Sequence, residues 1–243
     1  MDVSVIVPTY CEAENLPLLV PRISAALALA GLRGEILIVD DDSPDGPEAV
    51  CNELSTSYPV RLLIRRGERG LSGAVLHGIR EARGDVLVVV DADLSHPPET
   101  IPVLVRLIQS GEADFAIGSR FTEGGSTSQT WGVYRRLNAW FARLLARPLV
   151  SLRDPLAGFF ALSRSRFATV RDLDPVGYKI GLELLVKCGC RNVAEVPIHY
   201  RDRERGMSKL TLRAQVDYLR HLGRLYLFVM RRWVGRLLAS PER

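Results

Sequence analysis

The sequence predicts an α/β fold in which a mainly parallel sheet is flanked by helices. In residues 1–119, short β-branched runs alternate with segments whose apolar residues recur at helical spacing, and this alternation indicates parallel strands joined by helices. Length and composition agree with it: 243 residues, 47% hydrophobic and 25% charged, are ordinary for a globular chain that buries a sizeable core.

The elements follow in chain order. Strands are expected at Val3–Val7, Glu35–Val39, Val60–Ile64, Asp85–Val90 and Phe115–Ile117. Helices are expected between them at Leu16–Ala30, Pro47–Ser55, Ser72–Ala82 and Glu99–Gln109. The second half is expected to hold a mobile loop at 120–130, a basic helical stretch at Trp131–Arg147, a helix at 178–188, a strand at 193–199 and a long helix at Thr211–Ala239. We therefore expect one domain over residues 1–210, with halves 1–119 and 120–210, followed by a helix over 211–239.

Charge is unevenly distributed between the halves. Residues 1–119 hold 9 basic and 18 acidic residues, whereas residues 120–243 hold 23 basic and 10 acidic ones. An acidic half suits metal or neutral-ligand chemistry, and a basic half suits phosphate, nucleic acid or an anionic membrane. Because 29 of the 32 basic residues are Arg, fork-like binding of phosphate is favoured.

Cysteines and hydropathy indicate the compartment. The four cysteines have neither a disulfide framework nor zinc-ligand spacing, so we expect reduced cytoplasmic thiols. The N-terminus runs straight into the first strand without a leader pattern, and no run reaches the ~18 apolar residues that a spanning helix needs.

Acidic residues follow the second and fourth expected strands, at the edge where open parallel sheets bind ligands. Asp91 and Asp93 leave a buried strand one residue apart and can hold a divalent cation that bridges a diphosphate. The alternative is a strand-end turn in which Asp93 caps the next segment. Asp40 either bonds to a base or ribose or, with Asp41 and Asp42, forms a solvated turn that caps the next helix.

Two glycine-bearing loops are candidate phosphate sites. The loop Gly67–Gly73 matches neither the dinucleotide fingerprint nor the P-loop, which favours a simple helix start. The loop Arg203–Lys209 is basic and would either close over a diphosphate or remain a solvated charged loop.

The expected terminal helix is amphipathic. Its basic face holds Arg213, Arg220, Arg224 and Arg231, and its apolar face holds Leu212, Val216, Leu219, Leu222, Tyr226, Val229, Trp233 and Leu237. Such a helix either packs on the core or lies in a membrane interface with its arginines near lipid phosphates. The stretch Trp131–Arg147 repeats this chemistry.

Several segments carry a family resemblance. They are Val7-Pro8-Thr9-Tyr10-x-Glu12-x-Glu14-Asn15-Leu16, Val39-Asp40-Asp41-x-Ser43-Pro44-Asp45-Gly46, Asp91-Ala92-Asp93-Leu94-Ser95-His96-Pro97, Gly118-Ser119-Arg120-Phe121, Glu195-Val196-Pro197-Ile198 and Arg203-x-x-Gly206-x-Ser208-Lys209-Leu210. They resemble family 2 glycosyltransferases of the Rossmann-like GT-A fold and, more narrowly, dolichyl-phosphate (polyprenyl-phosphate) mannosyltransferases. Some relatives carry Gln at the position of Ser95.

The resemblance implies the roles of the donor-side residues. Pro8, Tyr10, Glu12, Ile38 and Asp40 would hold the nucleoside of GDP-mannose. Asp91 and Asp93 would bind Mg²⁺ or Mn²⁺, and Ala92 would contribute a backbone contact. Arg203 and Lys209 would clamp the diphosphate from a closing loop.

On the acceptor side, Arg120, Arg135 and Ser208 would contact the phosphate of a dolichyl or polyprenyl phosphate, and Asp93 and Arg120 would be the catalytic residues. Because a phosphate monoester is mostly ionised at neutral pH, with a second pKa near ~6, no general base is required. The resemblance and the terminal amphipathic helix imply an enzyme peripheral on the cytoplasmic face of a membrane, either monotopic or anchored by a membrane subunit.

Two other functions compete with this one. A polyprenyl-phosphate glucosyltransferase that uses UDP-glucose would have the same fold. A non-catalytic nucleic-acid-binding protein would leave the acidic clusters unexplained and lacks stacking motifs on a sheet, so we expect no nucleic-acid partner.

Overall fold

The computed structural model describes residues 1–127, 133–170, 172–174, 177–201 and 212–238, with only the backbone at 133–136, 212–214 and 235–238. Its main sheet contains β1 (Val3–Thr9), β2 (Gly34–Asp40), β3 (Val60–Ile64), β4 (Val86–Val89), β5 (Phe115–Ser119), β7 (Phe160–Ser163) and β8 (Val193–Pro197). These strands lie in the order β3-β2-β1-β4-β7-β5-β8. Among them β7 is antiparallel to both neighbours and the other pairings are parallel, so the predicted mainly parallel sheet is confirmed.

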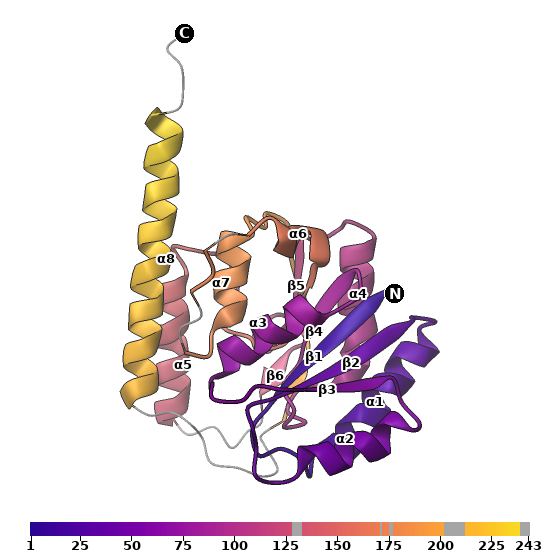
Figure 1. Ribbon diagram of the computed structural model, residues 1–243. Coiled ribbons are helices and arrows are strands. Elements are labelled where there is room, and N and C mark those ends of the chain that lie inside the picture. Colours follow the sequence, from indigo (N-terminus) through magenta and orange to yellow (C-terminus); the bar gives the residue numbers. More distant parts are fainter. Residues whose placement is uncertain (128–132, 171, 175–176, 202–211, 239–243) are drawn as a thin grey trace.

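Helices cover both faces of this sheet (Figure 1). They are α1 (Leu16–Leu29), α2 (Pro47–Ser55), α3 (Leu71–Glu81), the 3₁₀ turn η1 (Pro98–Thr100) with α4 (Ile101–Gln109), α5 (Val133–Ala146), α6 (Arg164–Ala168), α7 (Ile180–Lys187) and α8 (Leu212–Leu238). Helices α1, α2 and α4 pack on one face, and α3 and α7 pack on the other. Helices α5 and α8 pack together against α7, outside these layers.

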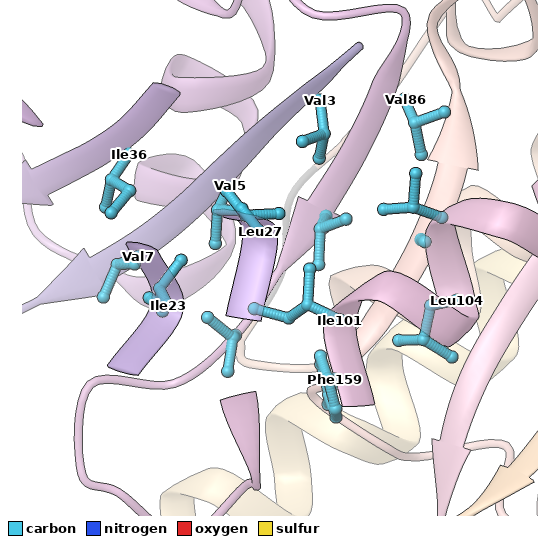
Figure 2. Close-up of a cluster of buried hydrophobic side chains, with 14 of the residues drawn as sticks. Val3, Val5, Val7, Ile23, Leu27, Ile36, Val86, Ile101, Leu104 and Phe159 are labelled. Carbon is cyan, nitrogen blue, oxygen red and sulfur yellow. The ribbon is translucent and has the colours of Figure 1, made fainter. Parts of the chain in front are cut away.

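The alternation of side chains along β1 divides the core into two layers. Val3, Val5 and Val7 face α1 and α4, as Figure 2 shows, whereas Ile6 faces α3. Gly78 of α3 lies directly over β1, and a Cβ there would be 2.5 Å from Cγ2 of Ile6. A glycine at this position therefore allows close packing of α3 on the sheet.

The predicted elements of the first half are confirmed, with β3 and α2 at the predicted ends. The short elements β7 and α6 were not predicted. They form one continuous segment, because Ser163 ends β7 and also caps α6 by accepting a hydrogen bond from the N–H of Arg166. Four or five residues are too few to show a periodicity.

The expected loop at 120–130 is wrong in part. Ser126–Thr127 forms a short strand, β6, that pairs in parallel with β9 (His199–Tyr200). Residues 128–130 lie outside the described part of the chain.

The terminal helix is confirmed, but its predicted apolar face needs correction. The stripe that packs on the protein consists of the buried Tyr218, His221, Leu222 and Leu225 and the partly buried Tyr226, and of these Leu222 and Tyr226 were on the predicted face. A second apolar stripe, which we call the outer stripe of α8, is exposed and consists of Leu219, Leu227, Met230 and Val234. The predicted residues Val216, Val229 and Trp233 are exposed as well, and the side chains of Leu212 and Leu237 lie outside the described atoms.

The helix therefore has one apolar stripe on the protein and another toward its surroundings. None of the helices in the described ranges combines the length and apolarity needed to span a bilayer.

Two leucines of α8 allow this packing to be tested. Leu222 is 3% exposed and Leu219 is 54% exposed. We expect Leu222→Ala to lower the opening free energy of α8 by about 2–4 kcal/mol, because it leaves a cavity. Leu219→Ala should change it by no more than about 0.5 kcal/mol. Native-state hydrogen exchange of the α8 amides measures both values, and equal effects would contradict the observed face.

Candidate functional site

The loops after β1 and β2 are fastened to each other at the carboxyl edge of the sheet. The N–H of Cys11 donates to Oγ of Ser43 over 2.9 Å, and the N–H of Ala13 donates to Oδ2 of Asp45 over 2.9 Å. Cys11 and Asp42 have φ values of 57° and 56°, and Leu94, after β4, has 59°. Left-handed backbone at non-glycine residues is costly and concentrates at functional sites.

Asp40 lies at the end of β2 and is 1% exposed. Its carboxylate accepts hydrogen bonds from Oγ1 of Thr9 over 2.9 Å and from N and Oγ of Ser43, both over 2.7 Å. These bonds shape the turn after the strand. A contact between Asp40 and a nucleoside stays a prediction.

Asp41 belongs to a buried ion pair, so the expectation of a solvated acidic turn is wrong for this residue. Oδ1 of Asp41 lies 2.5 Å from Nη1 of Arg65, and its Oδ2 accepts a hydrogen bond from the N–H of Gly70 over 2.7 Å. This ion pair fixes the glycine-bearing loop Gly67–Gly73. The loop leads into α3, so the helix start predicted there is confirmed. From the same loop, the guanidinium of Arg69 lies 4.7 Å from the ring centre of Tyr10.

The turn after β4 brings three metal-ligating side chains together. One ligand atom each of Asp91, Asp93 and His96 lies within 4.8 Å of the others. Asp93 and His96 are buried, and the side chain of Asp91 is 26% exposed. Burial lowers the pKa of His96 against the opposing effect of both carboxylates, which favours the neutral ring with a lone pair.

Gly158 closes this cluster from the other side. A Cβ on Gly158 would lie 3.0 Å from Oδ2 of Asp91, so the glycine leaves space next to that carboxylate. A side chain at this position would crowd the carboxylate.

Arg120 is held in a bidentate ion pair with Asp154. Nε and Nη2 of Arg120 each donate to the carboxylate over 2.8 Å, and its backbone N–H donates over 3.0 Å. Asp154 is fully buried, and burial would raise its pKa, but the hydrogen bonds and charge of Arg120 hold that pKa below its usual value. The guanidinium also lies 5.3 Å from the ring centre of Tyr200.

Lys179 adds a partly buried cation at the start of α7. Its Nζ donates to the carbonyl of Leu156 over 3.0 Å. Burial, reinforced by the charge of Arg120, lowers the pKa of Lys179 to about 8. Cationic side chains thus flank the acidic cluster on the side of Arg120, as the binding of an anion there requires.

The other predicted site residues are placed as follows. Pro8, Ile38 and Ala92 are buried, Ile38 with its side chain in the core between β2 and α1, whereas Tyr10 and Glu12 are partly exposed at the edge. Arg203, Ser208 and Lys209 lie outside the described residues, and Arg135 is described only by its backbone in α5. The predicted roles of all these residues in ligand binding stay predictions.

The sequence analysis did not single out Asp154, Lys179 or His96 as site residues. One signal for Asp154 exists: between residues 120 and 171, a strongly basic region, the acidic residues are Glu123 and Asp154. An isolated acid among many arginines is a natural ion-pair partner. No comparable pattern marks Lys179.

The chain resembles known proteins in sequence. Residues 4–171 match the family model of glycosyl transferase family 2. Three relatives named dolichol-phosphate mannosyltransferase come from Pyrococcus furiosus (46% identity, 98% of this chain, 66% of the relative), Mycosarcoma maydis (44%, 93%, 79%) and Saccharomyces cerevisiae (39%, 94%, 88%). The chain thus spans just under two thirds of the Pyrococcus protein's length.

Solved structures resemble it in fold. Glucosyl-3-phosphoglycerate synthase from Mycobacterium tuberculosis, in complex with Mn²⁺, UDP-glucose and phosphoglyceric acid, has a TM-score of 0.67 at 19% identity, covering 93% of this chain and 78% of that one. Its complex with Mg²⁺ and UDP has a TM-score of 0.64 at 18% identity, covering 85% and 72%. This likeness confirms the predicted fold class.

The buried Arg120–Asp154 pair allows a stability prediction. We expect Asp154→Asn to lower the free energy of unfolding by about 3–5 kcal/mol at pH 7, because Arg120 loses its counter-charge. The folded-state pKa of Asp154 is depressed, so its contribution is present above pH ~4 and is lost as pH falls through that lower pKa. The difference between wild type and variant should therefore shrink in acid.

Urea unfolding at pH 7 and at pH 3 measures this difference. Asp174→Asn is the matched control, because Asp174 also pairs with an arginine, Arg224, but is 60% exposed. It should cost no more than about 1 kcal/mol. Equal losses for both variants would refute the role of Asp154.

Proposed function

The chain belongs to glycosyl transferase family 2, and from this premise we propose that it transfers mannose from GDP-mannose to a dolichyl or polyprenyl monophosphate, which yields polyprenyl-phosphate mannose and GDP. The observation that carries the proposal is the identity of 39–46% with three dolichol-phosphate mannosyltransferases over at least 93% of this chain. The acidic cluster next to Arg120 is the site at which we place the reaction.

Asp91 and Asp93 suit a divalent cation such as Mg²⁺ or Mn²⁺. Such cations prefer oxygen ligands, and carboxylate oxygens of the two residues lie within 4.8 Å of each other. Gly158 has no side chain that would crowd the carboxylate of Asp91. When bound, the cation would neutralise charge on the departing diphosphate. The solved structures of similar fold contain Mn²⁺ or Mg²⁺, which supports a metal in this fold class.

The reaction is a single displacement with inversion. An oxygen of the ionised acceptor phosphate attacks the anomeric carbon of mannose as the bond to GDP breaks, so no side chain has to remove a proton. Arg120, oriented by Asp154, and the partly buried Lys179 supply positive charge beside the acidic cluster. We assign four further residues from the sequence analysis to the binding of the acceptor phosphate and the diphosphate: Arg135, Arg203, Ser208 and Lys209.

The donor nucleoside lies over the loops after β1 and β2. Tyr10 and Glu12 are partly exposed there, and Asp40 with Ser43 fixes the shape of the loop. Pro8, Ile38 and Asp40 are buried beneath it, so they shape the floor of the nucleoside site. UDP-glucose is the competing donor.

We further place the enzyme peripherally on the cytoplasmic face of a membrane. The outer stripe of α8 has a counterpart on the neighbouring α5, where Leu137, Trp140, Phe141 and Leu144 recur at helical spacing and are 41–60% exposed. Arg220, Arg224 and Arg231 lie beside the outer stripe. Apolar side chains flanked by arginines suit an interface with anionic lipid, and they suit equally an anchoring membrane subunit.

Activity with a short polyprenyl phosphate tests the donor and the metal together. We expect Mg²⁺- or Mn²⁺-dependent formation of the lipid-linked sugar from GDP-mannose, measured by mass spectrometry. Asp93→Asn should reduce the rate more than about a hundredfold, because it removes a metal ligand. The matched control is Glu53→Gln, an exposed acid on α2 that should leave the rate unchanged. Transfer only from UDP-glucose would reassign the donor, and full activity of Asp93→Asn would refute the site.

Cosedimentation with phosphatidylserine vesicles tests the membrane contact. We expect Leu227→Glu to weaken binding at least about tenfold, since a buried leucine side chain contributes about 1.5–3 kcal/mol and the new charge repels anionic lipid. Leu18→Glu on α1 is the control, because Leu18 is 56% exposed and Leu227 is 52% exposed. If the wild type fails to bind vesicles, the outer stripe does not contact lipid directly, and a membrane subunit becomes its partner in the proposal.

A further inference from the structure

The turn that carries Asp91 and Asp93 also positions His96 toward them. The ring of His96 is 4% exposed and packs against two aromatic rings, with centroid distances of 5.5 Å to Phe159 and 5.3 Å to Tyr200. These rings come from the segment before β7 and from β9, so two separate segments hold the imidazole in place. In that orientation Nδ1 lies 3.6 Å from Oδ2 of Asp91.

This distance is too long for a hydrogen bond and suits two ligands of one cation. With ligand distances of about 2.1 Å, neighbouring ligand atoms of an octahedral ion are about 3.0 Å apart and opposite ones about 4.2 Å. The ligand atoms of Asp91, Asp93 and His96 all lie within 4.8 Å of one another. Small rotations of the three side chains are enough to enclose an ion.

A purely structural role explains His96 less well. A core histidine normally satisfies its ring nitrogens with short hydrogen bonds. Here the contact of Nδ1 with Oγ of Ser95 is 3.4 Å, at the long limit for such a bond. Nδ1 also lies 3.6 Å from Oδ2 of Asp91, so this turn directs the nitrogen toward that carboxylate.

We propose that Nδ1 of His96 is the third protein ligand of the divalent cation held by Asp91 and Asp93, and that this nitrogen makes the site prefer Mn²⁺ to Mg²⁺. Imidazole is a good ligand for transition metals, whereas Mg²⁺ takes oxygen ligands almost exclusively. The inference rests on the proposed metal-dependent function and deepens it. It assigns metal preference to one residue.

Electron paramagnetic resonance with Mn²⁺ alone tests the assignment directly, without any turnover. We expect pulsed spectra of wild-type protein with Mn²⁺ to show modulation from a coordinated ¹⁴N nucleus. His96→Phe keeps an aromatic ring between Phe159 and Tyr200 but has no ligand atom, so the modulation should vanish and Mn²⁺ affinity should fall at least about tenfold. His199→Gln is the control, because His199 is an exposed histidine and its loss should leave the modulation intact.

His96→Asn provides the second variant, since its amide oxygen can replace Nδ1. We expect it to retain Mg²⁺ binding while the ratio of Mn²⁺ to Mg²⁺ affinity falls about tenfold. Wild-type Mn²⁺ binding that Asp93→Asn abolishes, but without nitrogen modulation and unchanged in His96→Phe, would overturn this inference and leave the proposed function standing. Absence of any Mn²⁺ binding to the wild type would overturn both.

Discussion

The buried carboxylate of Asp154 is the constraint on which the second half of the site depends. Asp154 accepts three hydrogen bonds from Arg120, and its own N–H donates to Oε1 of Glu195, which also accepts from Oγ of Ser119. Hydrogen bonds to the carboxylates of Asp154 and Glu195 thereby connect strand β5, strand β8 and the segment before β7. A buried acid without these donors would be costly, so the geometry of all three segments has to be maintained together.

In the first half of the site, too, buried carboxylates are held by hydrogen bonds from neighbouring segments. Asp40 and Asp41 are adjacent and buried, and each accepts hydrogen bonds from a separate loop, Asp40 from Ser43 and Asp41 from Arg65 and Gly70. Fully satisfied polar networks rigidify a structure, and here they hold Cys11 and Asp42 in left-handed backbone. Rigid loops of this kind fix the edge of the sheet at which we propose the donor binds.

The sequence predicted those features that repeat along the chain or lie close together in it. The βα alternation, the Asp91–Asp93 pair and the long terminal helix are of this kind. Pairings between distant residues could not be predicted: the isolated Asp154 indicates an ion pair with some arginine, but Arg120 is 34 positions away and nothing local identifies it as the partner. The predicted apolar face of α8 was correct at Leu222 and Tyr226 but mixed residues of two apolar stripes, because helical periodicity cannot tell which stripe packs on the protein.

The antiparallel β7 has a consequence for how the chain comes together during synthesis. Strands β1 to β4 can pair as soon as residue 89 has emerged, but β5 pairs only with β7 and β8 among the described strands, and both are made later. Until then β4 presents an open edge and β5 has no neighbour, a state prone to association with other chains. The acidic and basic halves of the sequence therefore share one sheet, and the strand pairing of β4 and β5 is complete only when β8, which ends at Pro197, has been made.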